Sequence, residues 1–275
     1  MKTLKTKLRI GKISYINAIP FYHGLGDSEA LPLEFYPAYP TKINEAVEKG
    51  ELDLAPISSL AYLKNQKEYL LLPHLAIGSR DFSGSVLLIS REKIENLNGK
   101  EIALTPQSLS SVALLKILLK NKFGFTNTFV KLPSTCRPAA TLFIGDEALF
   151  FKSEEFFYKY DLSELWWNWT AKPFCFALWA LRRKFAQSNP EEVSAFVCQL
   201  QRQTLSNLLD LEKLIQESLK LSFTEEAFTK VFGYLFNLNY HLDESMKEGL
   251  ELFFQMASNM NLAPRPGKIE FFEPA

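Results

Sequence analysis

The sequence predicts an α/β protein of two lobes, with mixed, mostly parallel sheets and a helical C-terminal part. Three observations support this prediction. The first part of the chain alternates short apolar runs with helical patterns, the middle repeats that alternation, and the last third reads as helices. With 275 residues and 47% hydrophobic content, the chain exceeds the usual size of one domain and is able to bury a large core.

The first block pairs each apolar run with a helix. Strands are expected at 8–13, 33–36 and 52–56, and helices at 19–25, 41–49 and 58–63. Thr41 is expected to cap the second helix, and Gly50 to end it. Because each strand is followed by a helix, we expect parallel pairing within this block.

The middle block has the same character. Strands are expected at 85–90, 101–105, 140–144 and 173–182, and an amphipathic helix at 108–123. The C-terminal helices are expected at 189–214, 224–236 and 243–260, with an edge strand at 268–272.

Two apolar segments, 85–90 and 174–180, join one block of alternating elements to the next and are interpreted as hinges. On this interpretation residues 1–88 and 181–275 form a discontinuous first lobe, and residues 89–180 form the second. A ligand cleft is expected between them.

Charge and composition exclude several classes of function. Lys+Arg and Asp+Glu both number 31, so the formal net charge is +0 and no global field attracts nucleic acid or an anionic membrane. Basic residues interrupt the N-terminal sequence before an apolar stretch forms, and no run approaches 18 apolar residues, so we expect a cytoplasmic protein without a membrane span.

Metal and nucleotide sites also lack support. Cys136, Cys175 and Cys198 are isolated rather than in CxxC spacing, and are expected to be reduced thiols. No histidine has a second ligand at metal spacing, and neither GxGxxG after a strand nor GxxxxGK[ST] occurs. No metal is therefore expected, and the oligomeric state stays open.

Small polar residues recur at four strand-to-helix junctions. In an open parallel sheet such junctions lie at the carboxyl ends of the strands, where backbone N–H groups and helix ends favour anions. Two lobes presenting them across a cleft would suit a ligand with two carboxylates. For any single junction, ordinary helix capping is the favoured explanation, and the recurrence is what indicates a site. The junction residues are Ser14, Tyr15 and Asn17; Ser58 and Ser59; Thr105, Gln107, Ser108, Ser110 and Ser111; and Gly145 and Asp146.

Six segments in order resemble one family. The segments are RIGKISYINAIPFYHGL, LDLAPISSLAYL, GSVLLISR, ALTPQSLSSVALLKILL, LFIGDEAL and PFCFALWALR. Together they resemble the chorismate dehydratases of the futalosine route to menaquinone, which have a periplasmic-binding-protein type II fold. The resemblance covers roughly the first two-thirds of the chain, and the C-terminal part matches only in general character.

The resemblance implies a reaction and site residues. Chorismate would lose water to give 3-[(1-carboxyvinyl)oxy]benzoate, with no metal or organic cofactor. Asn17 in SYINAIP and Ser85 in GSVLLIS would be catalytic. Substrate binding is assigned to the other junction residues Tyr15, Ser58, Ser59, Thr105, Ser108, Ser110, Ser111, Gly145 and Asp146.

The proton acceptor stays open. Asp146 would serve if burial raised its pKa, and the alternative, which we favour, is the enolpyruvyl carboxylate of the substrate itself. Two other functions also remain: an anion-binding protein of the same fold, and the sister enzyme that forms dihydroxynaphthoate. The segment 132–138 reads as a turn where the family leads us to expect a short helix, so whether Arg137 reaches a carboxylate is also open.

Overall fold

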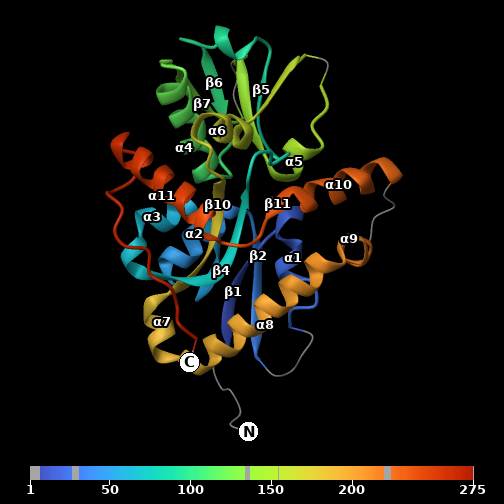
Figure 1. The fold of residues 1–275 in the computed structure, drawn as a ribbon, viewed down its shortest axis with the longest axis vertical. Helices are drawn as coiled ribbons and strands as arrows, with labels where there is room; N and C mark the ends of the chain where they lie inside the picture. The colour runs from blue at the N-terminus through green and yellow to red at the C-terminus, as the bar shows by residue number, and fades with distance from the viewer. Residues whose placement is uncertain (1–6, 27–30, 134–136, 154, 220–223, 275) are drawn as a thin grey trace.

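The protein has two lobes, each built on its own β-sheet (Figure 1). The structure is a computed structural model, and it describes residues 7–26, 31–133, 137–153, 155–219 and 224–274. Cys136 lies outside these residues, and so does the middle of the turn predicted at 132–138.

The larger sheet has six strands in the order β11-β4-β10-β3-β1-β2. β1 pairs with β2 and β3 in parallel, whereas β10 runs antiparallel to β3 and β4, and β11 antiparallel to β4. The strands are β1 (Leu8–Ile13), β2 (Leu33–Ala38), β3 (Leu54–Ser58), β4 (Tyr69–Ser79), β10 (Phe174–Arg182) and β11 (Leu238–Asn239).

The smaller sheet has five strands in the order β7-β6-β8-β5-β9. β6 is parallel to β7 and β8, and β5 is antiparallel to β8 and β9. The strands are β5 (Val86–Ser90), β6 (Glu101–Leu104), β7 (Thr128–Lys131), β8 (Ala140–Ile144) and β9 (Tyr158–Asp161).

The segments predicted as hinges each lie within one sheet. β5 belongs wholly to the smaller sheet and β10 to the larger, so the chain crosses between the sheets at 80–85 and again at 171–173. Ser85 therefore stands at the end of the first crossing rather than inside a strand shared by both lobes.

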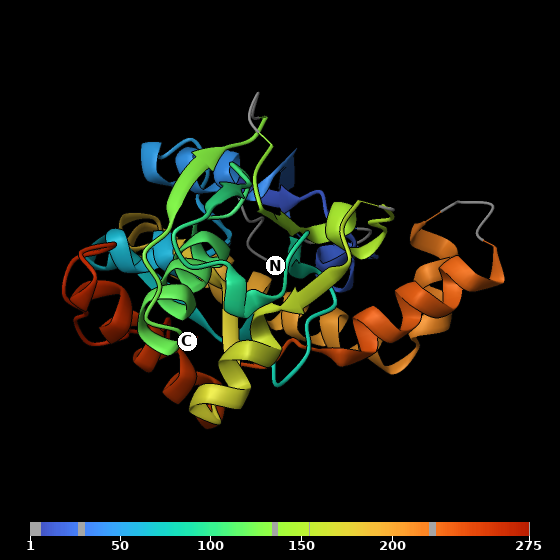
Figure 2. The same cartoon turned by 90° about the horizontal axis from the view of Figure 1, so that it is seen from above.

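Helices cover both sheets and form most of the last third of the chain. α2 packs on β1 and β3, α8 packs on β4 and α1, and α11 packs on β10. In the view from above, α9 and α10 extend to one side of the body (Figure 2). The α-helices are α1 (Ile19–Tyr22), α2 (Pro40–Lys49), α3 (Ser59–Lys64), α4 (Leu109–Ile117), α5 (Gly145–Leu149), α6 (Leu162–Thr170), α7 (Arg183–Ser188), α8 (Pro190–Leu209), α9 (Leu211–Ser218), α10 (Glu225–Asn237) and α11 (Glu244–Asn259). Single 3₁₀ turns occur at η1 (Ile16–Ala18), η2 (Gln66–Glu68) and η3 (Ile94–Asn96), and α4 continues into the π-helical turn η4 (Leu118–Lys122).

Aromatic side chains of distant segments meet behind the first strand-to-helix junction. Phe21 of α1 meets the Trp179 ring edge-on at 5.4 Å, and Trp179 in turn packs on Phe196 of α8 at 6.1 Å. Such pairs stabilise by about 0.5–1.5 kcal/mol beyond their area burial. The start of α1 is thereby fixed against β10 and α8.

Several predicted element boundaries are wrong in detail. Thr41 does not cap α2, because Pro40 takes the first helical position and Tyr39 precedes it, although Gly50 ends the helix at φ 77° as expected. The helix predicted to run from 189 to 214 breaks at Asp210, whose side chain accepts from Lys213 N and so caps α9. The expected edge strand at 268–272 is a single parallel bridge between Leu71 and Phe271.

Candidate active site

A cavity of about 60 Å³ lies between the lobes, where the carboxyl ends of β1 and β3 face the start of α4 and the end of β8. It is narrow, and it combines apolar walls with hydroxyl and amide side chains. None of the described residues that line it carries a charge. The lining residues are Ile13, Tyr15, Asn17, Pro40, Ser58, Ile77, Ser85, Val86, Ser108, Ser111, Ile144, Gly145, Phe176, Ala177 and Leu238.

Asn17 and Ser85 both line this cavity, and they come from different lobes. Asn17 lies in η1, which begins three residues after the end of β1, and Ser85 directly precedes β5. Among the described residues, the buried Oδ1 of Asn17 has no hydrogen-bond partner. An unsatisfied buried oxygen at a cavity wall indicates that its partner is something the cavity binds or a side chain that moves toward it.

A buried carboxylate holds the turn that presents Ser85. Asp161 accepts hydrogen bonds from Gly84 N at 2.7 Å, from Ser83 N at 3.1 Å and from Ser83 Oγ at 2.9 Å. It also accepts from Ser163 N at 2.8 Å, as the cap of α6. Burial raises the pKa of Asp161, and these hydrogen bonds oppose that rise. Asp161 therefore fixes the position of Ser85, and sequence reasoning missed it.

Ser58, Ser108 and Ser111 line the cavity as part of two helix starts. Ser58 Oγ accepts from Ala61 N at 3.2 Å and so caps α3. Ser108 Oγ accepts from Ser111 N at 3.2 Å and donates to Ser111 Oγ at 2.9 Å. Each hydroxyl thus has a hydrogen-bond partner within the protein. These serines belong to helix caps and line the cavity at the same time.

Asn44 of α2 supports the Ser58 junction. Its Oδ1 accepts from Ser58 N at 3.1 Å, and its Nδ2 donates to Ser58 Oγ at 3.3 Å. Asn44 is buried on α2, and the residue spacing of this helix indicates an apolar face and nothing more. The sequence therefore gave no sign that Asn44 supports Ser58.

Ser59, Ser110 and Thr105 are not brought to the cavity wall. Ser59 Oγ lies 2.9 Å from Ser110 Oγ and donates to Cys175 O at 2.8 Å, while Ser110 Oγ accepts from Leu60 N. Thr105 Oγ1 accepts from Gln107 N. These hydroxyls tie α3 to α4 and shape the local turn, so their placement does not support the predicted role in substrate binding.

Tyr15 and Gly145 contact each other in the wall of the cavity. Gly145 has φ +60°, and a Cβ there would lie 2.9 Å from Tyr15 Cε1. Tyr15 Oη donates to Gln107 Oε1 in the other lobe. Gly145 N donates to the Ser85 carbonyl at 2.8 Å. Only glycine fits at this position, because the backbone is left-handed and the tyrosine ring covers it.

Asp146 faces a different part of the molecule. Its Oδ1 accepts from Ile16 N at 3.0 Å, and it lines a neighbouring groove with His23 and Ser218 rather than the cavity of Asn17 and Ser85. Burial raises the pKa of Asp146, and the Ile16 N–H opposes this rise. The carboxylate links the lobes, and its position favours neither substrate binding nor proton abstraction in the cavity.

At each helix start near the cavity one N–H group is already bonded within the protein, and the expectation that the helix ends bind the ligand stays a prediction. The N–H groups of Ile16, Ala61 and Ser111 donate to side chains, and that of Gly145 donates to a carbonyl. In addition, α1, α3 and α5 are short. Side chains with hydroxyl or amide groups also line the cavity, at Tyr15, Asn17, Ser58, Ser85, Ser108 and Ser111.

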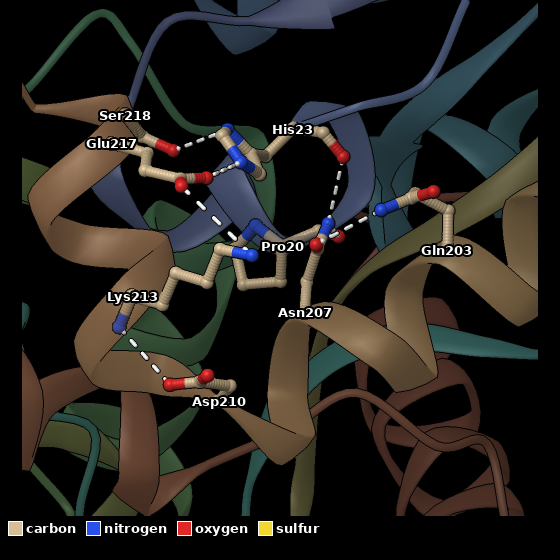
Figure 3. A network of polar contacts seen from close by, with 8 residues as sticks. All are labelled: Pro20, His23, Gln203, Asn207, Asp210, Lys213, Glu217 and Ser218. Carbon is tan, nitrogen blue, oxygen red and sulfur yellow. Dashed lines mark hydrogen bonds and ion pairs between the residues drawn. The ribbon is translucent and has the colours of Figure 1, made fainter. Parts of the chain in front are cut away.

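The C-terminal helices hold the segment after Asn17 from outside (Figure 3). Asn207 of α8 donates from Nδ2 to the carbonyls of Pro20 and His23, both at 2.9 Å. His23 lies 2.9 Å from Glu217 through Nε2 and 2.9 Å from Ser218 through Nδ1. The sequence gives no sign that α8 and α9 belong to a site, yet they position the segment that follows Asn17.

Other residues considered from the sequence lie away from the cavity. Arg137 is exposed and pairs with Glu155 at 3.2 Å. Among the described residues, Cys175 is a buried free thiol and Cys198 an exposed one. No group of three or more His, Cys, Asp or Glu in the described ranges is placed to hold a metal ion. Likewise, no helix in that part of the chain has the length and apolar character to cross a membrane.

Comparisons with known proteins agree with this architecture. A family model described as menaquinone biosynthesis matches residues 8–259. A chorismate dehydratase from Thermus thermophilus is 29% identical over 280 residues, which covers 93% of this chain and 96% of that relative.

Solved structures extend the likeness to the fold. A protein from Archaeoglobus fulgidus gives a TM-score of 0.72 at 20% identity, covering 93% of this chain and 98% of that one. The alkanesulfonate-binding protein from Xanthomonas axonopodis pv. citri gives a TM-score of 0.66 at 15% identity, covering 98% and 96%. These neighbours have the two-lobed fold of periplasmic binding proteins, so the predicted fold class is confirmed.

Proposed function

The chain belongs to the menaquinone biosynthesis family, and from this membership we propose that it is a chorismate dehydratase, a hydro-lyase that forms 3-[(1-carboxyvinyl)oxy]benzoate and water. The observation that carries the proposal is the cavity in which Asn17 and Ser85, from different lobes, face one enclosed space. Its apolar walls match the chemistry of a six-membered carbon ring, and its hydroxyl and amide groups match that of carboxylate oxygens. At about 60 Å³ the cavity is smaller than such a substrate, so the proposal requires the lobes to move apart to admit it.

The reaction breaks two bonds on neighbouring ring carbons. A base removes the proton from the carbon that bears the enolpyruvyl ether, and the C–H electrons become part of the aromatic ring. The C–O bond of the adjacent hydroxyl breaks, and the departing oxygen takes a proton to leave as water. Asn17 and Ser85 are proposed to orient the substrate and to donate hydrogen bonds to the departing oxygen or to a carboxylate.

We favour the enolpyruvyl carboxylate of the substrate as the base. Asp146 is bonded to Ile16 N and is not among the residues that line the cavity. No charged side chain is found among the described lining residues, so no cation there lowers the basicity of a bound carboxylate. Partial desolvation between apolar walls raises a carboxylate pKa, which favours proton uptake.

Incubation with chorismate tests the proposed function. We expect the ultraviolet spectrum to change to that of an aromatic product, and mass spectrometry to detect a compound lighter than chorismate by one water. Chorismate that is bound but unchanged would favour an anion-binding protein, in keeping with the fold of the solved neighbours. Chorismate that is neither bound nor changed would favour the sister enzyme that forms dihydroxynaphthoate.

Substitution of the two proposed catalytic residues tests their assignment. Asn17→Ala and Ser85→Ala are each expected to lower kcat by roughly 10²–10³-fold, the range seen when a preorganised donor is removed. Ser90→Ala is the matched control, because Ser90 is a buried serine at the opposite end of β5 and bonds to the Glu92 and Ala139 carbonyls. If Asn17→Ala or Ser85→Ala kept the activity of the Ser90→Ala variant, the assignment of that residue would be wrong.

The cytoplasmic location expected from the sequence stays a prediction. Fractionation of cells that produce the full-length protein would test it, with activity expected in the soluble cytoplasmic fraction.

A further inference from the structure

The carbonyl oxygen of Asn17 lies where one helical turn ends and the next begins. The 3₁₀ turn η1 ends at Ala18, and α1 begins at Ile19. In a 3₁₀ turn a carbonyl accepts from the N–H three residues later, and for Asn17 that residue is Pro20, which has no N–H. The proline in the first turn of α1 therefore deprives this carbonyl of its local donor.

A tyrosine 223 positions later in the chain supplies a donor. Tyr240 Oη donates to the Asn17 carbonyl at 2.9 Å. Tyr240 is 5% exposed, and its ring packs edge-on against Phe21 of α1 at 5.6 Å. A hydrogen bond of this length is directional, so it fixes the orientation of the peptide that follows Asn17.

The main chain of Tyr240 is itself anchored to the larger sheet. β11, which directly precedes this residue, pairs with β4. Ala76 N of β4 donates to the Tyr240 carbonyl at 3.1 Å. Leu238 of β11 lines the cavity. The segment after α10 thus forms part of the cavity wall and also holds the turn that carries Asn17.

We propose that Tyr240 is a positioning residue for Asn17: its hydroxyl holds the peptide of Asn17, and the held peptide sets the direction in which the amide side chain faces the cavity. This inference rests on the proposed function of the same site, because that proposal assigns Asn17 its part in the reaction. Tyr240 is not among the described residues that line the cavity, so it acts through Asn17 rather than on the substrate.

The hydroxyl of Tyr240 is a permanent donor. Burial raises the pKa of Tyr240 well above its ordinary value, and the neighbouring Tyr234 raises it further. The phenol therefore keeps its proton across the range in which the enzyme would work, and the bond to the Asn17 carbonyl is maintained.

A double-mutant cycle tests the proposal by activity. Tyr240→Phe removes the hydroxyl and keeps the ring against Phe21, and it is expected to lower kcat roughly tenfold with little change in KM, because a displaced donor loses contacts made in the transition state. In an Asn17→Ala background the carbonyl is present but the amide is gone, so kcat is expected to fall no further.

Stability is expected to respond differently from activity in this cycle. The melting temperature should fall in both backgrounds, because the buried carbonyl loses its partner in each. An equal fall of kcat in both backgrounds would overturn the proposal, and so would an unchanged kcat when Tyr240→Phe is the only substitution.

Tyr22→Phe is the matched control. Tyr22 is a buried tyrosine of α1 whose hydroxyl donates to the Gly11 carbonyl at 2.9 Å and accepts from Ile13 N at 3.3 Å. Both partners belong to β1, which its pairing with β2 holds in place without the tyrosine. Tyr22→Phe is therefore expected to lower the melting temperature and to leave kcat of the folded protein unchanged. A fall in kcat as large as that of Tyr240→Phe would reveal a general effect of losing a buried hydroxyl and would overturn the proposal.

A second measurement needs no substrate. The side-chain amide signals of Asn17 in a ¹H–¹⁵N spectrum are those missing from the Asn17→Ala variant. They are expected to shift or broaden in Tyr240→Phe and to stay unchanged in Tyr22→Phe. Unaltered Asn17 signals in Tyr240→Phe would refute the positioning role. This result does not depend on activity, so an unmodified protein that left chorismate untouched would refute the proposed function separately.

Discussion

Replacement of Asp161 by alanine tests whether the turn before Ser85 depends on one buried carboxylate. The substitution leaves five donors without their acceptor: Ser83 N, Gly84 N, Ser163 N, Glu164 N and Ser83 Oγ. Each buried donor left unsatisfied costs about 1–3 kcal/mol. Relaxation and entry of water reduce the sum, so we expect a loss of about 3–5 kcal/mol in the free energy of unfolding, as when one partner of a buried polar pair is removed.

Activity should fall together with stability in this variant. Ser85 is the next residue after Gly84, so loss of the Asp161 contact frees the backbone that presents it, and we expect kcat for chorismate to fall by at least ~10-fold. Asp161→Asn keeps one acceptor oxygen and avoids a buried charge, so its loss should be smaller, about 1–2 kcal/mol. Urea unfolding gives the stability change from the midpoint and slope.

Asp53→Ala is the matched control. Asp53 is similarly buried and bonds to Arg9 N and Nε at 3.0 Å, but it lies at the amino end of β3, away from Ser58 and the cavity. We expect a similar loss of stability with kcat of the remaining folded protein unchanged. The reasoning would be refuted if the two variants lost kcat equally, or if Asp161→Ala lost less than about 1 kcal/mol, below the penalty for a single unsatisfied donor.

Four other perturbations test neighbouring parts of the site. Gly145→Ala should lower the free energy of unfolding by about 1–2 kcal/mol because of its left-handed backbone, and by more because of the contact with Tyr15. The control Gly124→Ala has φ +72° and open space around it, so it should lose only the backbone contribution. Equal unfolding midpoints for the two variants would contradict this. The raised pKa of Asp146 means that the folded state holds the carboxyl proton more tightly than the unfolded state. The free energy of unfolding should therefore fall as pH rises from the unfolded pKa through the folded one. Asp146→Asn should reduce this dependence on pH, measured by urea titration at several pH values, and an unchanged dependence would contradict the reasoning. Asn44→Ala should destabilise by about 1–2 kcal/mol and raise KM, since it releases Ser58 N, and an unaltered KM would separate Asn44 from the site. Saturating product should reduce the radius of gyration in X-ray scattering if the lobes close on the ligand, and superimposable curves would refute closure.

Most strands are predictable from the sequence because buried strands are local features. Apolar runs such as 86–90 and 140–144 carry their own signal, and each is a strand in the structure. β4 was missed for a local reason as well: Pro73 and His74, the latter at φ 65°, interrupt the run, and the pairing with β10 shifts register there.

The site was predictable only where its residues adjoin strand ends. Asn17, Ser58, Ser85 and Ser108 follow or precede apolar runs, and all four line the cavity. The residues that hold them come from distant segments, since Asp161, Asn207 and Tyr240 act across 77, 187 and 223 positions of the chain. Contacts between segments this far apart depend on how the whole chain packs, so local sequence patterns do not predict them.

A cavity whose described lining residues carry no charge suits a reaction in which the net charge does not change. Chorismate and the proposed product both carry two carboxylates, so the site has no new permanent charge to neutralise. What changes is transient: a proton leaves carbon, and an oxygen departs. An arginine in the wall would bind the carboxylates more tightly in substrate, transition state and product alike, which does not accelerate chemistry. It would also lower the basicity of the carboxylate proposed as the base. Neutral donors such as Asn17 and Ser85 hold the substrate without that penalty, and their directionality favours the one arrangement in which the carboxylate reaches the proton.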